Sequence, residues 1–190
     1  MTPFEYVTVL ISIVLGLGIT QIVTGTADII QNWERVKLYW PHLLWIVLVF
    51  FLHLQEWWVL FELRHMQQWR LPTFFFTILS PINLFILARI LFPASHEGGP
   101  TDLKTYYFNS YRKFFLMIAI LAAISFIDNV FINSYPLELQ FIPVGLMAVM
   151  GYGAARGYHK EWIHKVLVAA FVLVLMISVV VNWEDWTLSA

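Results

Sequence analysis

The chain of 190 residues contains no cysteine, which excludes disulfides, iron–sulfur clusters and thiol chemistry. Charge is also scarce, because Asp, Glu, Lys and Arg together make up 12% of the residues, against about 25% in an ordinary soluble domain. Soluble globular domains and disordered chains are excluded, since both need more surface charge. The net charge of −1 gives no indication of nucleic-acid binding.

Apolar side chains are abundant instead. They account for 60% of the sequence, and the mean hydropathy is +0.74. At roughly 20 residues per transmembrane helix, the length allows six or seven spans and no sizeable extramembrane domain. The apolar runs do not alternate with a period of two, so they are typical of helices rather than barrel strands. We therefore predict an all-α integral membrane bundle that forms one domain over residues 1–190.

Six apolar segments are predicted to cross the bilayer. They cover approximately residues 5–31, 39–64, 71–92, 106–133, 138–158 and 162–183. The first segment lacks a basic leader and is too long for the apolar part of a signal peptide, so we expect it to be retained. Thr101 and Asp102 precede the fourth segment and are typical of an N-terminal helix cap.

The basic residues predict the orientation of the bundle. Nine of them lie in or beside the first, third and fifth connections: Arg35, Lys37, Arg89, Lys104, Arg112, Lys113, Arg156, Lys160 and Lys165. The second connection holds only Arg64 and Arg70. Cytoplasmic loops carry an excess of Lys and Arg, so this bias predicts both termini outside, an N-out/C-out bundle.

Small and hydroxyl-bearing residues recur at a spacing of four in the first span. They are Ser12, Gly16, Thr20, Thr24 and Asp28. Such a row predicts a seam at which two helices pack closely. The alternative is that Thr20 and the neighbouring Gln21 line a polar path.

Glycines are frequent in the fifth span, whereas the sixth span is almost wholly apolar. The glycines are Gly145, Gly151, Gly153 and Gly157. They predict a close-packing face toward the sixth helix or a second subunit. The sixth helix is expected to face lipid or an oligomer partner.

The second span contains His53 and, three residues later, Glu56. This spacing places the two side chains on roughly the same face of a helix. A His and a Glu so placed can share a proton, bind a cation or coordinate a metal, and His titrates near physiological pH. The alternative is a mutually satisfied polar pair that only locks the helices together.

Further polar residues lie in the third and fourth spans. Asn83 follows Pro81, which frees a backbone carbonyl inside the third helix. Asp128 and Asn129 lie toward the outer end of the fourth helix. If the second and fourth helices are neighbours, these residues and Glu56 form one acidic cluster that attracts cations or holds a carboxyl proton.

Near the cytoplasmic side, Asp28 and Arg89 have a comparable depth in the first and third helices. We expect them to pair as a structural lock or an inner gate.

Known cofactor and catalytic motifs are absent. The sequence has no nucleotide-binding loop, no nucleophile elbow and no His-Glu-x-x-His zinc motif. A di-iron bundle needs a Glu-x-x-His motif on each of two helices and further carboxylates, whereas His53 and Glu56 in the second span have the reverse order. No cofactor or metal is predicted, although a haem held by His42 and His159 is geometrically conceivable.

The opening segment Met1–Tyr6, the stretch Ser12–Gly18 and the pair Trp57-Trp58 resemble a group of small bacterial multi-pass membrane proteins without an assigned activity. The resemblance implies a location in the bacterial inner membrane. It implies no catalytic residues.

The sequence thus favours a small transporter or channel for protons, cations or a small solute, with its polar core in the first four helices. His53, Glu56 and Asp128 are the expected titratable centre, and Asn129, Asn83 and Gln21 are expected to line the path. A non-catalytic membrane subunit, sensor or scaffold is the alternative, and a haem-dependent or metal-dependent oxidoreductase is a third. The expected partners are the lipid bilayer, another copy of the chain or a membrane subunit, and no nucleic acid.

Overall fold

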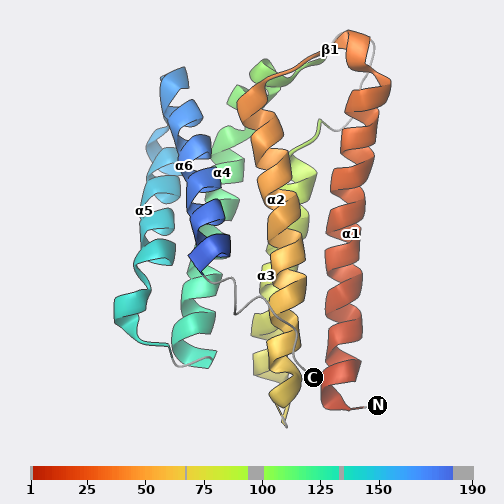
Figure 1. Cartoon of the computed structure of the whole chain (residues 1–190), viewed down its shortest axis with the longest axis vertical. Helices are drawn as coiled ribbons and strands as arrows, with labels where there is room; N and C mark the ends of the chain where they lie inside the picture. Colours follow the sequence, from red (N-terminus) through yellow and green to blue (C-terminus); the bar gives the residue numbers. More distant parts are fainter. Residues whose placement is uncertain (1, 67, 94–100, 133–134, 182–190) are drawn as a thin grey trace.

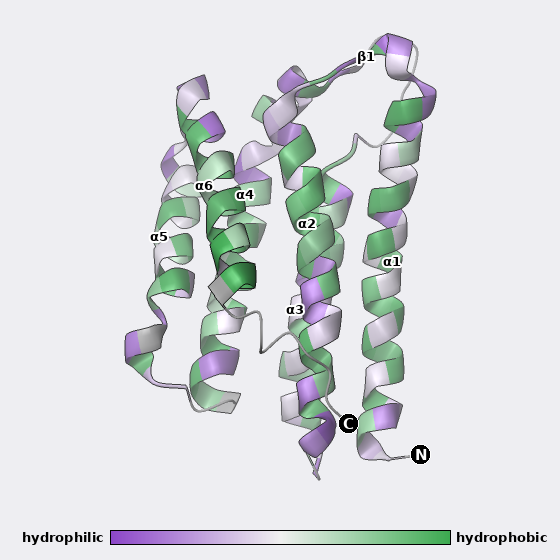
Figure 2. Ribbon diagram, in the orientation of Figure 1, coloured by the Kyte–Doolittle hydropathy of each residue, from purple (hydrophilic) through white to green (hydrophobic). Residues whose placement is uncertain are grey.

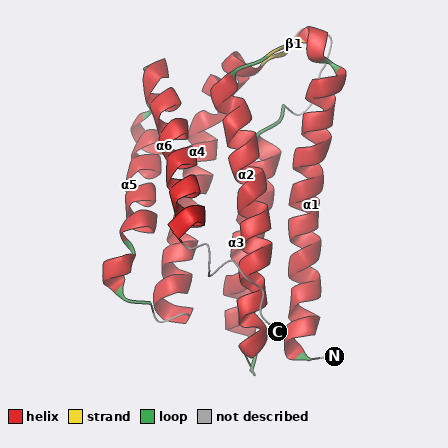
Figure 3. Ribbon diagram, in the orientation of Figure 1, coloured by secondary structure: helices red, strands yellow, loops and turns green. Residues whose placement is uncertain are grey.

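The computed structural model describes residues 2–66, 68–93, 101–132 and 135–181. In these residues the chain is a helical bundle (Figures 1 and 3). The α-helices are α1 (Pro3–Gln31), α2 (Trp40–Val59), α3 (Leu71–Ile90), α4 (Leu103–Ile127), α5 (Phe141–Arg156) and α6 (Glu161–Val181). The all-α prediction is confirmed. The predicted ends of the fourth and sixth spans, at residues 133 and 183, lie outside the described residues.

Short elements lie between the helices. They are η1 (Trp33–Arg35), β1 (Val36–Lys37), η2 (Leu60–His65), β2 (Thr101–Asp102), the π-helical turn η3 (Asp128–Ile132) and η4 (Leu137–Leu139). Strand β1 pairs in parallel with β2, so that Val36 lies opposite Thr101 and Lys37 opposite Asp102. This two-residue ladder joins the α1–α2 connection to the start of α4.

The helices pack in a row that does not follow the chain order. Helix α1 packs against α3, α3 against α4, and α4 most extensively against α5. Helix α2 packs against α1 and α3, and α6 packs against α2. In the view of Figure 1, α2 and α6 lie in front of this row. The arrangement brings α2, α3 and α4 together around the polar residues described below.

Five helical segments are long and apolar enough to cross a membrane: Pro3–Gln31, Trp40–His65, Leu71–Ile90, Leu103–Phe131 and Glu161–Val180. Figure 2 shows hydrophobic residues along these helices and a hydrophilic stretch within α2. The predicted fifth span is shorter than expected, because α5 has 16 residues and rises only about 24 Å. Helix η4 takes up part of the expected start of the fifth span. Gly157, with φ at 81°, follows the last residue of α5.

Two helices begin at side-chain caps. At α1 the Thr2 hydroxyl accepts a hydrogen bond from the Glu5 backbone N–H, and the Glu5 carboxylate accepts one from the Thr2 N–H. At α4 the Asp102 carboxylate accepts hydrogen bonds from the backbone N–H groups of Lys104 and Thr105. These caps satisfy amide donors that the helix itself leaves unpaired. The cap predicted at Asp102 is confirmed.

The face of α1 that packs is not the predicted one. Ser12, Thr20 and Thr24 are exposed, and the space beside Gly16 is open. Helix α1 packs instead through buried residues on a different face of the helix. They are Val7, Ile11, Leu15, Gly18, Ile22, Gly25 and Ile29. The expected seam is therefore wrong within this chain, because large apolar side chains supply more buried area than the small residues do.

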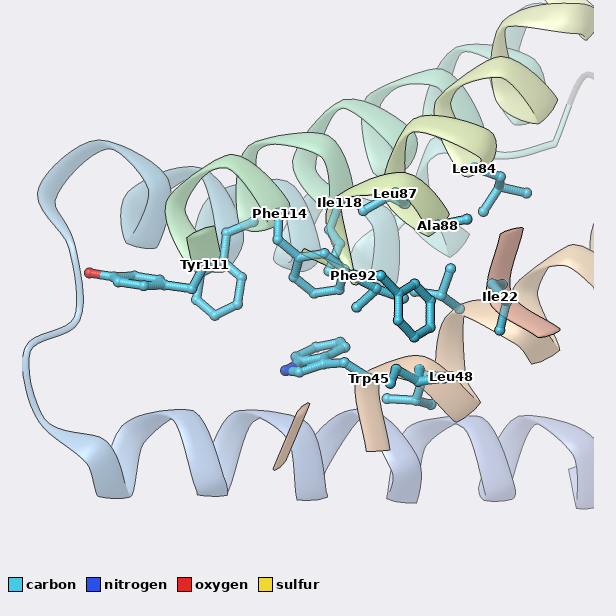
Figure 4. Packing of buried hydrophobic residues seen from close by; sticks show 14 of the residues in the cluster. Ile22, Trp45, Leu48, Leu84, Leu87, Ala88, Phe92, Tyr111, Phe114 and Ile118 are labelled. Atoms are coloured by element: carbon cyan, nitrogen blue, oxygen red, sulfur yellow. The ribbon is translucent and has the colours of Figure 1, made fainter. Parts of the chain in front are cut away.

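Buried apolar residues from all six α-helices form the core, part of which is shown in Figure 4. Trp45 of α2 packs edge-on against Phe114 of α4 and Phe171 of α6, with ring centroids 5.1 and 5.0 Å away. Near the other side of the core, Phe92 packs against Gly25, where a Cβ atom would overlap its ring. Edge-to-face aromatic packing and one close backbone approach thus join four elements of the bundle.

Gly153 is the one predicted glycine within α5 that packs on α4, and Gly157, directly after the helix, lies against Tyr111 of α4. Gly153 contacts Phe115 of α4 and Tyr158, whereas Gly145 and Gly151 have open space beside them. Arg112 of α4 donates hydrogen bonds of 2.8 and 2.6 Å to the carbonyls of Ala154 and Ala155. These carbonyls are at the C-terminus of α5, where a cation also favours the helix dipole.

Candidate carboxyl site

Two carboxyl groups on different helical elements, Glu56 and Asp128, act on each other through their charges. Glu56 of α2 interacts with the Ser80 hydroxyl of α3 and lies near enough to Asp128 for their charges to repel. Asp128 is the first residue of η3, the π-helical turn that ends α4. Its Oδ1 atom is buried without a hydrogen-bond partner among the described residues. The predicted acidic cluster of Glu56, Asp128 and Asn129 stays a prediction, because only the action of the Asp128 charge on Glu56 is seen.

No Lys, Arg or His in the described part of the chain forms an ion pair with either carboxyl group. Ser80 is buried, while Glu56 and Asp128 are half-buried. Where two such carboxyl groups approach closely in apolar surroundings, they can share a proton or bind a cation, because two negative charges repel each other there. The π-helical turn that carries Asp128 is itself a geometry found often at functional sites.

His53 is not part of this pair. Its Nδ1–H donates a 2.7 Å hydrogen bond to the Val49 carbonyl of its own helix. The imidazole lies against Gly18 of α1, and Nε2 is buried without a hydrogen-bond partner among the described residues. His53 therefore faces α1, whereas Glu56 faces α3 and α4. The shared proton expected from their spacing has no geometric basis here.

The three predicted lining residues lie in different places. Asn83 is buried one helical turn beyond Ser80, and its amide donates weakly to the Met117 sulfur, 3.9 Å away. Asn129 donates a 2.9 Å hydrogen bond to the Gln140 side chain, which holds the start of α5 to the end of α4. Gln21 is half-buried on α1. Only Asn83 therefore shares a helix face with the carboxyl site.

The predicted lock between Asp28 and Arg89 is absent. Neither residue forms an ion pair in the described residues, and Arg89 is exposed. The charge of Arg89 acts instead on Tyr106 of α4, whose hydroxyl donates to the Ile90 carbonyl. The expectation was wrong because similar depth on two helices does not place their side chains on facing sides.

A pocket of about 180 Å³ lies between the start of α1 and the end of α2. Its lining residues are Phe4, Thr8, Ser12, Trp57, Trp58, Leu60 and Phe61. Trp57 and Trp58 follow Glu56 directly in the sequence, but Glu56 does not line the pocket. The pocket is an aromatic groove beside the carboxyl site and not part of it.

Among the described residues, no group of three or more His, Cys, Asp and Glu side chains is arranged to hold a metal ion. The two histidines of the haem alternative have different environments. His42 is buried and its Nε2–H donates a 2.8 Å hydrogen bond to the Leu91 carbonyl, whereas His159 is exposed. The geometry gives no support to a pair of axial ligands.

A second polar cluster escaped sequence reasoning. Tyr107 of α4 is hydrogen-bonded to His164 of α6 at 2.9 Å, and both side chains are buried. The available signal was the spacing of Tyr39, His42 and Trp45, which recur every three residues and face this cluster. Interfacial aromatic residues are so common near the ends of membrane helices that this spacing did not stand out.

The fold is that of an all-helical protein with several helices long and apolar enough to cross a membrane. No family model, no curated protein and no solved structure matches the chain. The resemblance to bacterial multi-pass proteins, and the inner-membrane location that it implies, stay predictions. Function is therefore inferred from the site.

Proposed function

We propose that the protein is an integral membrane transporter or channel for protons or small cations, with Glu56 and Asp128 as its ion-handling centre. The observation that supports this most is that the charges of Glu56 and Asp128, on separate helical elements, act on each other while neither forms an ion pair with a basic residue among the described residues. Ionisable groups within membrane helices are expensive, so they usually have a function. Asn83 and Ser80 supply further polar atoms on the α3 side.

Proton flux into liposomes that contain the purified protein tests this proposal. A potassium diffusion potential drives the flux, and an enclosed pH-sensitive dye reports it. We expect Glu56→Gln and Asp128→Asn each to lower the flux at least tenfold, since each removes one exchangeable carboxyl proton. Glu62→Gln is the matched control, because Glu62 is exposed in η2 just beyond α2.

Thermal unfolding in detergent distinguishes a variant that has lost ion transport from one that no longer folds. A variant that has lost flux but keeps its melting temperature supports a functional carboxyl pair. Wild-type flux no higher than that of empty liposomes, for protons and for Na⁺ and K⁺, would sink the proposal. Flux that survives both carboxyl substitutions would remove Glu56 and Asp128 from it.

A non-catalytic membrane subunit is the second candidate, and the exposed row on α1 favours it. Ser12, Thr20 and Thr24 are exposed, and Gly16 has open space beside it, as a helix-packing surface for another chain requires. Gly16→Leu should then dissociate an assembly seen by light scattering in detergent. Gly145→Leu is the control, because Gly145 also has open space beside it. A protein that is monomeric before substitution rules out self-assembly through this row.

A further inference from the structure

Three basic side chains lie at the corner of the bundle where α5 leads into α6. They are Arg112 on α4, Arg156, the last residue of α5, and Lys160 in the connection to α6, and all three are exposed. No carboxylate among the described residues forms an ion pair with any of them. Like charges without a counterion repel each other, so this basic corner favours the binding of an anion from outside the chain.

Arg112 is held beside Arg156 by hydrogen bonds. Its Nε and Nη2 atoms donate to the carbonyls of Ala154 and Ala155 at 2.8 and 2.6 Å. The Ala155 carbonyl carbon is bonded to the Arg156 nitrogen, so the guanidinium of Arg112 lies against the backbone that carries Arg156. These bonds use two of the five N–H donors of the guanidinium, and donors remain for an anion.

The connection that carries Lys160 is held in place on both sides. Gly157, with φ at 81°, lies against the hydroxyl of Tyr111 on α4. The Tyr158 carbonyl accepts a 2.8 Å hydrogen bond from Nε2 of His164 on α6. Lys160 therefore stands on a fixed backbone near the two arginines, where an anion can contact all three groups.

The carboxylates of α4 and α6 at this end have other partners. Glu161 follows Lys160 directly, but its two oxygens bind Lys104 at 2.6 Å and Lys165 at 2.9 Å. Asp102 caps α4, where its carboxylate accepts hydrogen bonds from backbone N–H groups. The positive charge of the basic corner is therefore not compensated within the described residues.

Exposed apolar residues continue from each arginine toward the middle of the bundle, at a spacing of three or four positions. They are Leu116 and Ile120 on α4, and Tyr152 and Val149 on α5. Residues at this spacing share a helix face. The two helices are antiparallel, because Asn129 at the end of α4 is bonded to Gln140 at the start of α5. Both apolar rows therefore run in the same direction from the basic corner.

We propose that the basic corner binds an acidic phospholipid, with its phosphate at Arg112, Arg156 and Lys160 and its acyl chains along the two apolar rows. Phosphate oxygens match the donors of a guanidinium in charge and geometry. Basic clusters beside membrane helices attract anionic headgroups. A soluble phosphate compound would match the basic residues alone, whereas a lipid matches the basic corner and the apolar rows together.

This inference goes beyond the proposed function and rests only on insertion of the bundle into a membrane. Arg112 and Asp128 are 16 positions apart on α4 and the turn that follows it, about 24 Å along the helix axis. The lipid would therefore bind far from the carboxyl site. It would join α4, α5 and the connection to α6 at the membrane surface.

Native mass spectrometry of the purified protein, titrated with phosphatidylglycerol, tests the site, and phosphatidylcholine is the neutral comparison. We expect tighter binding of phosphatidylglycerol. Arg156→Gln and Lys160→Gln should each weaken that binding about fivefold, the effect of one basic residue near a membrane surface. Lys37→Gln is the matched control, because Lys37 is an exposed lysine of β1 outside the basic corner.

The melting temperature in detergent should stay the same in Arg156→Gln and Lys160→Gln, because both side chains are exposed. Equal affinity for the two lipids, or an equal loss in Lys37→Gln, overturns the proposal. Displacement of the lipid by glycerol 3-phosphate shows a site for a soluble phosphate compound and also overturns it. Selective lipid binding in a protein without ion flux supports the lipid site and refutes the proposed function, and flux without selective lipid binding does the reverse.

Discussion

The His53 imidazole of α2 lies directly against the α-carbon of Gly18 in α1, and a Cβ atom at Gly18 would overlap the ring. We predict that Gly18→Ala destabilises the protein by about 1–3 kcal/mol, the usual cost of overpacking a core. Thermal unfolding in detergent measures this change. Gly16→Ala is the matched control, because the space beside Gly16 is open and alanine is a better helix former.

A smaller side chain at position 53 should relieve the clash. The double variant Gly18→Ala, His53→Ala is expected to be more stable than the sum of the two single changes predicts. Additive effects would contradict the close contact between the two residues.

Arg112 should hold the C-terminus of α5 in place. Arg112→Gln removes both hydrogen bonds to the Ala154 and Ala155 carbonyls and the charge that favours the helix end. We predict faster amide hydrogen exchange along α5 and little change in α1. Lys113→Gln is the control, because Lys113 is an exposed neighbour with no such bonds to α5. Equal exchange in both variants would refute the anchoring role.

Asp28 and Arg89 should be energetically independent. Because they form no ion pair, we predict that Asp28→Asn and Arg89→Gln each change the free energy of unfolding by less than about 0.5 kcal/mol. A double-mutant cycle should give no coupling between them. A coupling free energy well above about 0.5 kcal/mol would support the ion pair between Asp28 and Arg89 that their similar depth predicts.

The orientation of the bundle is open to direct labelling, because the chain has no natural cysteine. We predict that a membrane-impermeant maleimide labels Glu62→Cys in intact bacterial cells and leaves Glu34→Cys unlabelled until the cells are permeabilised. Both positions are exposed, and they lie at opposite ends of α2. The reverse pattern would contradict the orientation that the basic residues indicate.

Helix positions were predictable from the sequence because long apolar segments have one solution in lipid. The first, third and sixth spans were expected at 5–31, 71–92 and 162–183, and α1, α3 and α6 lie at Pro3–Gln31, Leu71–Ile90 and Glu161–Val181. The sixteen-residue α5 was harder to predict, because hydropathy alone does not show where the short helix η4 and Gly157 take residues from a helix.

Helix rotation was not predictable, and most errors at the site follow from it. His53 and Glu56 are about 60° apart around the helix axis, which is enough for one to face α1 and the other α3 and α4. A helix that is apolar on all sides gives no signal for its buried face. That explains why Ser12 and Thr20 of α1 are exposed although their spacing predicts a seam. The acidic cluster of Glu56 and Asp128 was predicted only on the condition that the second and fourth helices are neighbours.

The ladder between β1 and β2 makes the two ends of the bundle mechanically unequal. It fastens the α1–α2 hairpin to the start of α4 at one end. Glu56 and Asp128 lie near the opposite ends of α2 and α4. We therefore expect water to reach the carboxyl groups more readily from that end, because the ladder ties the opposite end together.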